Sequence, residues 1–292
     1  MSGRSRIDDP ITAEAIERRL RTRRLARTIE YHPVIDSTNR RAVDLAHAGA
    51  PDGTLVLADH QTQGRGRLAR RWHAPPGSSL LFSLLLRPPL KPPEAQQATM
   101  LCAVAAVETI AKGTGLAAAI KWPNDILVAD RKAGGILTEL VPSAAALGAH
   151  GIAIIVGIGL NVSLELADLP PDVWRTATTP PTSLAAELGR PVPRLPLLLG
   201  FLHRADTLYD RLLQSTDAKG SARTPRWSPL PLWRKHLATL GKQVSIATRE
   251  GTVEGTAIDV DNDGGLLIEK QDGCTERILV GDVVRRDQTP ST

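Results

Sequence analysis

The chain has 292 residues, of which 42% are hydrophobic and 23% charged, proportions that are ordinary for a globular protein and exclude a disordered or fibrous one. Its 36 basic and 31 acidic residues give a formal net charge of +5, which favours anionic ligands without requiring nucleic acid. The longest apolar run, residues 152–160, is far shorter than the roughly 18 residues that span a bilayer, and residues 1–10 lack the apolar stretch of a signal peptide.

The first predicted element is a polar helix over residues 12–27, with Ile16, Leu20 and Leu25 as a thin apolar stripe. A winged helix-turn-helix needs about 60 residues and three helices, so residues 1–30 are too few for such a DNA-reading domain. We expect a solvated basic face, with nucleic-acid contact as the alternative. The basic residues are Arg18, Arg19, Arg21, Arg23, Arg24 and Arg27.

The next elements alternate between helices and short strands. Asp36 or Ser37 is predicted to cap a helix that ends near Ala48, and an alanine-rich helix is expected over residues 93–112. Apolar runs bounded by turn residues predict the strands. These runs cover residues 54–58, 79–86, 120–122, 126–128, 136–141 and 152–158.

A basic loop follows the first of these strands and reads Gly64-Arg65-Gly66-Arg67-Leu68-Ala69-Arg70-Arg71-Trp72. Glycines let a backbone approach an anion closely, and guanidinium groups match the oxygens of phosphate or carboxylate. Taken alone, such a segment is more often a solvated or RNA-binding loop than an active site. Three further motifs at strand ends change that balance: Lys121-Trp122-Pro123-Asn124-Asp125, Arg131-Lys132-Ala133-Gly134-Gly135-Ile136 and Gly157-Ile158-Gly159-Leu160-Asn161.

The C-terminal part of the chain is predicted to contain helices over residues 182–188 and 195–213. Residues 214–229 are polar and rich in breakers, which predicts a mobile insertion. Four alternating runs then predict a small SH3-like barrel; they cover residues 243–247, 252–260, 265–269 and 275–280. A prior of about 150 residues per domain favours two domains, so we expect an N-terminal extension at 1–30, a catalytic domain at 31–238, and a barrel with its tail at 239–292.

Five motifs taken together resemble the biotin-protein ligase family, whose members are also called biotin-[acetyl-CoA-carboxylase] ligases. The resemblance covers roughly residues 30–290 and implies an α+β fold, with a mixed-sheet catalytic domain of the biotin/lipoate ligase type and a C-terminal SH3-like barrel. It is closest to the short form without an N-terminal DNA-binding domain. The motifs are Asp36-Ser37-Thr38-Asn39, Gln61-Thr62-Gln63-Gly64-Arg65-Gly66-Arg67, Lys121-Trp122-Pro123-Asn124-Asp125, Lys132-Ala133-Gly134-Gly135-Ile136-Leu137 and Gly157-Ile158-Gly159-Leu160-Asn161.

The resemblance implies a reaction in two steps. The biotin carboxylate attacks the α-phosphate of ATP and releases pyrophosphate, and the biotinyl-adenylate then transfers biotin to a lysine of a carrier domain. Because two anions must meet in the first step, positive side chains are needed to hold them together. We predict that Lys132 and Arg67 are the catalytic residues, with Arg65 and Lys121 as further cations.

The same resemblance assigns the binding residues. The biotin site is predicted to comprise Ser37, Thr38, Asn39, Gln61, Gly64, Arg65, Gly66, Arg67, Lys132 and Gly135. The ATP or adenylate site is predicted to comprise Arg65, Arg67, Arg70, Trp72, Lys121, Asn124, Asp125 and Asn161. Asp125 and Asn124 are weaker candidates for holding the Mg²⁺ that accompanies ATP.

Plainer structural roles remain open for three of these residues. Ser37 suits a helix N-cap, and Trp72 suits ordinary packing as well as a cover over the ligand. Asp125 has the alternative of a structural ion pair with Lys121 or Arg131.

The expected partners are biotin and the biotin carboxyl carrier domain of an acyl-CoA carboxylase, with no specific DNA and no membrane. Cys102 and Cys274 lack metal-ligand or disulfide-framework spacing, which favours a reducing, cytoplasmic location. Two other functions remain open. One is a ligase for lipoate or octanoate, and the other is a binding module, either a biotin-sensing DNA-binding regulator or an RNA-binding protein.

Overall fold

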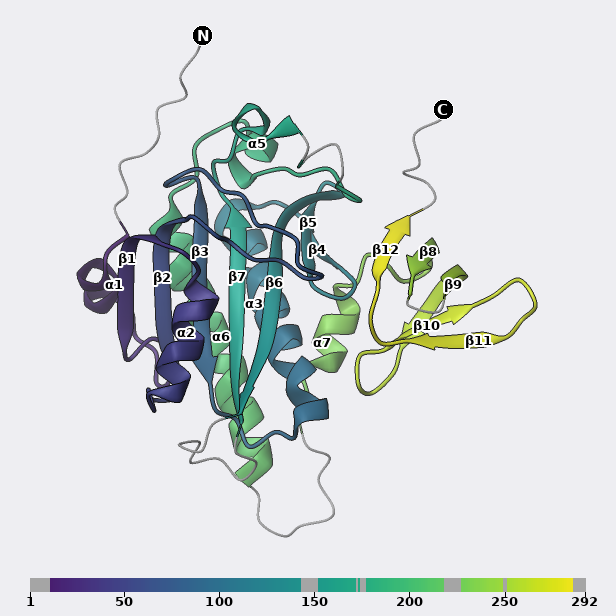
Figure 1. The fold of residues 1–292 in the computed structure, drawn as a ribbon, viewed down its shortest axis with the longest axis horizontal. Coiled ribbons are helices and arrows are strands. Elements are labelled where there is room, and N and C mark those ends of the chain that lie inside the picture. The colour runs from purple at the N-terminus through teal and green to yellow at the C-terminus, as the bar shows by residue number, and fades with distance from the viewer. Residues whose placement is uncertain are drawn as a thin grey trace.

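The computed structural model describes residues 11–142, 152–171, 173, 177–217, 227–248 and 251–285 (Figure 1). The first half contains α1 (Ala13–Arg19), β1 (Ile29–Ile35), α2 (Thr38–His47), β2 (Thr54–Gln61), β3 (Ser79–Leu86), η1 (Pro92–Ala95), α3 (Gln96–Thr114), β4 (Ala118–Lys121), β5 (Asp125–Val128), β6 (Arg131–Pro142) and β7 (Ile152–Asn161). The second half contains η2 (Leu166–Asp168), α5 (Leu184–Leu188), α6 (Arg194–Asp217), α7 (Leu230–Lys235), β8 (Gln243–Ala247), β9 (Thr252–Val260), β10 (Leu266–Glu269), β11 (Thr275–Ile278) and β12 (Asp282–Arg285).

A mixed sheet of seven strands, in the order β1-β2-β3-β7-β6-β5-β4, organises the larger part of the chain. The β1–β2 pair is parallel and the other pairs are antiparallel. Helix α2 lies over one face of the sheet, and α3 and α6 lie over the other (Figure 1). Every residue of β3 is buried, because helices cover both faces of the sheet at this strand. A strand buried on both faces reads as a continuous apolar run rather than an alternating one.

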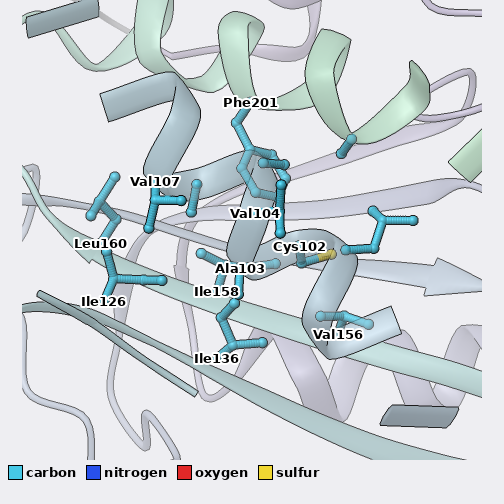
Figure 2. Packing of buried hydrophobic residues seen from close by; sticks show 14 of the residues in the cluster. Cys102, Ala103, Val104, Val107, Ile126, Ile136, Val156, Ile158, Leu160 and Phe201 are labelled. Atoms are coloured by element: carbon cyan, nitrogen blue, oxygen red, sulfur yellow. The ribbon is translucent and has the colours of Figure 1, made fainter. Parts of the chain in front are cut away.

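The main core lies between the sheet and the helices α3 and α6. Figure 2 shows Val104 of α3 beside Phe201 of α6, with Val156 and Ile158 of β7 in the same cluster. The Phe201 ring meets the ring of Phe82 edge-on, with centroids 5.1 Å apart. Each large side chain buried in this way contributes about 1.5–3 kcal/mol relative to exposure, so this layer provides a rigid base for the strand ends.

The C-terminal residues form an antiparallel sheet of five strands, in the order β11-β10-β9-β8-β12. It lies beside the β4 and β5 edge of the larger sheet (Figure 1). Among the described residues β11 and β12 do not pair with each other, so the sheet is open. The predicted α+β class and mixed sheet are therefore confirmed, whereas closure into an SH3-like barrel stays a prediction.

Several element boundaries differ from those expected. Helix α1 ends at Arg19 instead of residue 27, because the backbone N–H groups of Arg23, Arg24 and Leu25 instead donate to the Asp206 carboxylate of α6. Residues 214–217 of the expected insertion continue α6, and residues 218–226 lie outside the described part of the chain.

Four elements were not expected from the sequence: β1, the short 3-10 helix η2, α7 and β12. The strand pattern of β1 is obscured by Pro33. An edge strand tolerates proline, which lacks a backbone N–H, because the outward side of the strand has no partner to receive one. No helix among the described residues is long and apolar enough to cross a membrane.

Candidate active site

One cleft collects most of the residues that the sequence singled out. It lies where the start of α2, the basic loop after β2, the turn before β5 and the middle of β6 and β7 meet. The predicted site residues that line it are Ser37, Thr38, Asn39, Gln61, Arg65, Gly66, Arg67, Arg70, Trp72, Asn124, Asp125, Lys132 and Gly135. Residues that line it without having been assigned to it are Arg71, Ile136, Leu137, Gly157, Ile158, Gly159 and Asp282.

Three glycines form the floor of the cleft. Gly135 of β6 pairs directly with Gly159 of β7. A Cβ atom on Gly159 would lie 2.6 Å from the Trp72 ring, and one on Gly157 would lie 1.9 Å from Asn39 Oδ1. Both distances are too short for any side chain, so the glycines of β7 are there to admit the side chains of Asn39 and Trp72 into the cleft.

A hydrogen-bonded chain of side chains orients the wall formed by α2. Gln61 Oε1 accepts from the Thr38 backbone N–H at 2.8 Å and from its hydroxyl at 3.1 Å. Ser83 Oγ bonds to Thr38 Oγ1 at 2.8 Å and to Asn39 Oδ1 at 2.6 Å. Ser37 caps α2 by accepting from the backbone N–H of Arg40, so its expected structural role is present and compatible with its place in the cleft.

Glu139 continues this chain and was missed by sequence reasoning. Its carboxylate accepts from Asn39 Nδ2 at 2.8 Å and from Arg65 Nη2 at 2.6 Å. The signal was available, because residues two apart on a strand share a face and Glu139 follows Gly135 and Leu137 along β6. Ser83 is a comparable omission, since it is one of two serines in the otherwise apolar strand β3.

Each main cation of the cleft has a polar partner. Lys132 Nζ lies 2.6 Å from Asp125 Oδ1, Arg67 Nη1 donates to Asn124 Oδ1 at 3.0 Å, and Arg70 pairs with Asp282. Burial is the main reason why the pKa of Arg67 is lowered from its ordinary value, and the nearby carboxylates of Asp282 and Asp125 oppose that shift. An anionic group that enters the cleft can therefore accept hydrogen bonds from cationic donors that already lie close together.

The basic loop is a narrow hairpin. The Gly66 N–H donates to Arg70 O at 2.8 Å, and the Trp72 N–H donates to Gly64 O at 2.9 Å. Leu68 and Ala69 at the tip have positive φ values of 54° and 59°, a conformation that disfavours side chains with a Cβ. The loop therefore holds Arg67 and Arg70 on the cleft side of a strained tip.

Trp72 closes the hairpin and lies against the glycine floor. Its Nε1 is buried and has no hydrogen-bond partner among the described residues. Lys132 Nζ lies 5.9 Å from the centroid of its ring, within reach of a weak cation–π contact. The indole thus combines the packing role with a place in the cleft.

Three predicted residues lie outside the cleft lining. Lys121 is buried and donates to Thr179 Oγ1 at 2.7 Å, and its burial lowers the pKa of its ammonium. Asn161 donates to Thr182 O at 3.0 Å and accepts from a serine hydroxyl of β3. Gly64 meets the Trp72 carbonyl, which a Cβ would approach to 2.4 Å. These contacts give the three residues structural roles, and their assignment to biotin or ATP stays a prediction.

The expected alternatives for Asp125 are also resolved by geometry. Asp125 pairs with Lys132, whereas Arg131 pairs with Glu187 at 3.3 Å. The described residues contain no group of three or more His, Cys, Asp or Glu side chains that could hold a metal ion. Asp125 and Asn124 offer one carboxylate and one amide oxygen, which suits a Mg²⁺ ion that arrives with phosphates and keeps several waters.

Comparison with known proteins gives matches over both sheets. Residues 31–161 match the model of the biotin/lipoate A/B protein ligase family, and residues 239–286 match that of the biotin protein ligase C-terminal domain. The bifunctional ligase/repressor BirA of Bacillus subtilis is 34% identical over 265 residues, which cover 90% of this chain and 76% of that protein. The biotin–[acetyl-CoA-carboxylase] ligase of Mycobacterium tuberculosis is 29% identical over 295 residues, covering 97% and 99% of the two chains. Among solved structures, the biotin protein ligase of Aquifex aeolicus in complex with biotin and ATP matches with a TM-score of 0.69 and 26% identity, covering 89% of this chain and 99% of that one.

Proposed function

The chain belongs to the biotin/lipoate A/B protein ligase family and is a ligase, and from that premise we propose that it activates biotin with ATP as biotinyl-5′-AMP. The biotin carboxylate oxygen attacks the α-phosphorus, and the bond to pyrophosphate breaks. A lysine amine of a biotin carboxyl carrier domain then attacks the acyl carbon, forms an amide and releases AMP. A cytoplasmic location belongs to the same proposal and is supported by two cysteines that are free thiols.

The observation that carries this proposal is the convergence of five cations on one glycine-floored cleft. The five are Arg65, Arg67, Arg70, Arg71 and Lys132, which come from two separate segments and all line it. A carboxylate and a phosphate repel each other, so a site that joins them needs positive groups fixed before the anions arrive. Lys132, with its compact ammonium beside Gly135, is our candidate for contacting both anions in the first step.

In this proposal, the anionic groups of the ligands bind by replacing the side-chain carboxylates that pair with the cations of the cleft. Arg65, Arg70 and Lys132 are paired with Glu139, Asp282 and Asp125 respectively. Charged hydrogen bonds to carboxylate and phosphate oxygens are as strong as those they replace, so ligand anions can substitute for side-chain carboxylates without leaving a cation unpaired. These pairs thus avoid the cost of gathering several unpaired positive groups.

The two ends of the cleft suit the two parts of the intermediate. The wall of Ser37, Thr38 and Gln61 offers hydroxyl and amide groups for the ureido ring of biotin, and Ile136 and Ile158 supply apolar lining. We assign the opposite end, with Arg70, Trp72 and Asn124, to the nucleotide. Mg²⁺ held by Asp125 and Asn124 would neutralise phosphate charge when bound with ATP.

A labelling experiment tests the proposal. The protein is incubated with ATP, Mg²⁺ and radiolabelled biotin or lipoate, with and without an apo carrier domain. Biotin label that becomes acid-stable only on the carrier, and only with ATP, is the expected result. Transfer of lipoate in place of biotin would assign the cleft to the related acid, and binding of biotin without any transfer would reduce the protein to a binding module.

A further inference from the structure

Trp122 joins the motif at residues 121–125 to the C-terminal sheet. The residue is 2% exposed, and its Nε1 donates to the carbonyl oxygen of Gly264 at 2.9 Å. Its backbone N–H donates to Thr239 Oγ1, also at 2.9 Å. Both bonds therefore run to the C-terminal part of the chain, although Trp122 itself lies between β4 and β5 of the larger sheet.

The turn that receives Trp122 is held in shape by its own carboxylates. Asp261 Oδ1 accepts from the backbone N–H groups of Asp263 at 2.9 Å and Gly265 at 2.8 Å. Arg277 of β11 pairs with Asp261 and, at 2.7 Å, with Asp263. Arg277 thus clamps both arms of the turn from outside.

Gly264 brings this turn into close contact with the larger domain. Its φ is +82°, and a Cβ at this position would lie 2.3 Å from Met100 Cε of α3. A residue with a side chain would be strained by the backbone conformation and would have to displace the end of the Met100 side chain. Glycine at position 264 therefore lets the turn pack closely against α3 while its carbonyl faces Trp122 Nε1.

The other side of the motif holds the candidate catalytic cations. Asn124 bonds to Ile136 of β6 through its backbone oxygen at 3.0 Å and through its Nδ2 at 2.5 Å. Its Oδ1 accepts from Arg67, and the next residue, Asp125, pairs with Lys132. Only Pro123 separates the residue anchored to the C-terminal sheet from the residues that hold Arg67 and Lys132.

We propose that Trp122 is a positioning residue, and that the turn at residues 261–265 acts through it to set where Asn124 and Asp125 hold Arg67 and Lys132. This inference rests on the proposed function of the cleft. A displacement of about 1 Å can lower a rate about 100-fold when reacting groups must be aligned. The biotin wall of α2 and β2 does not touch this linkage, so loosening it impairs the use of ATP more than the binding of biotin.

Two variants separate positioning from packing. Arg277→Gln releases the clamp at a side chain that is 43% exposed, so the fold is retained while the turn loosens. Trp122→Phe keeps most of the ring volume and removes the N–H that reaches Gly264. The matched control is Lys270→Gln, which breaks the exposed Lys270–Glu276 pair on the same β10–β11 hairpin without touching the turn.

The measurement is biotin-dependent exchange of pyrophosphate into ATP, with kcat/KM for ATP and KM for biotin determined separately, beside Tm. We expect kcat/KM for ATP to fall by about fivefold or more in both variants, KM for biotin to stay within about twofold, and Lys270→Gln to match the wild type. If kcat/KM for ATP stays at the wild-type value in both variants, Trp122 is a packing residue and the proposal is overturned, whether or not Tm falls. If the wild-type protein itself shows no biotin-dependent exchange, the proposed function fails and this inference fails with it.

Discussion

At the scale of single residues, Lys132 is the side chain on which the proposed chemistry depends most. Its side chain is 30% exposed and its ammonium pairs with Asp125 at 2.6 Å, so it stands at the cleft wall instead of in the core. We expect Lys132→Ala to lower the rate of biotin-dependent pyrophosphate exchange by more than tenfold, a loss above about 1.4 kcal/mol in activation free energy. Lys112→Ala, at an exposed position near the end of α3, is the control. A Lys132→Ala enzyme that keeps more than about a tenth of the rate would remove the catalytic assignment.

The two cysteines differ in reactivity for a physical reason that can be measured. Burial raises the pKa of the Cys102 thiol to about 12, whereas Cys274 is exposed. The thiolate is the reactive form, so at about pH 8 the native protein should take up one equivalent of a maleimide and the unfolded protein two. The variant Cys274→Ser should take up none while folded. Rapid modification of Cys102 in that variant would show that the α3 layer opens readily.

At the scale of elements, the basic hairpin is expected to act as a clamp on the intermediate. Arg67 reaches both Asn124 and the backbone oxygen of Gly281 before β12, so it bridges the two sheets across the cleft mouth. We expect Arg67→Gly to release biotinyl-adenylate faster and to allow diffuse labelling of lysines on unrelated proteins. The control is Leu68→Ala at the exposed loop tip. Trapping experiments in which Arg67→Gly holds its intermediate as long as the wild type would leave Arg67 as a general electrostatic contributor.

Strand β7 is expected to tolerate no side chain at its cleft glycines. In Gly159→Ala the new methyl group would lie 2.6 Å from the Trp72 ring, so the indole must leave the glycine floor. We predict that ATP affinity falls by at least about tenfold, or 1.4 kcal/mol, with the strand still folded. Gly113→Ala on α3 is the control, because its methyl group would meet only a flexible leucine side chain at 3.2 Å. Calorimetric titration with ATP measures the effect, and equal affinity in both variants contradicts the prediction.

At the scale of the whole molecule, the N-terminal segment is fastened to α6 by one buried carboxylate. Asp206 accepts three backbone N–H groups at 2.8–2.9 Å and is 7% exposed. Each orphaned donor costs about 1–3 kcal/mol, so Asp206→Ala should lower the free energy of unfolding by at least about 3 kcal/mol. Asp210→Ala removes exposed interactions only, the pairs with Arg23 and Arg24, whose side chains are 82% and 43% exposed, and a hydrogen bond from Gln214, and should cost about 0–1 kcal/mol. Urea denaturation compares the two, and similar losses would show that the segment is not fastened in this way.

Patterns in short stretches of sequence predicted those elements whose structure depends on neighbouring residues in the chain. Strand β3 and helix α3 follow from apolar runs of the right period and length. The basic loop and the glycine motif at residues 157–161 follow from residue types that serve backbone conformation and charge. Sequence alone therefore indicated the family and the main set of cations.

Only the tertiary structure decided which residues the predicted site residues contact. Asn39 meets Ser83 and Glu139, which are 44 and 100 positions away, and Trp122 meets Gly264 at a separation of 142. Lys121, taken from the sequence as a ligand contact, is buried against Thr179. Such contacts arise only when strands distant in the chain pair in one register, and no local propensity encodes that register. The chain's own residue types thus determined which charges are available, and the packing of its two sheets determined where each charge stands and what it contacts.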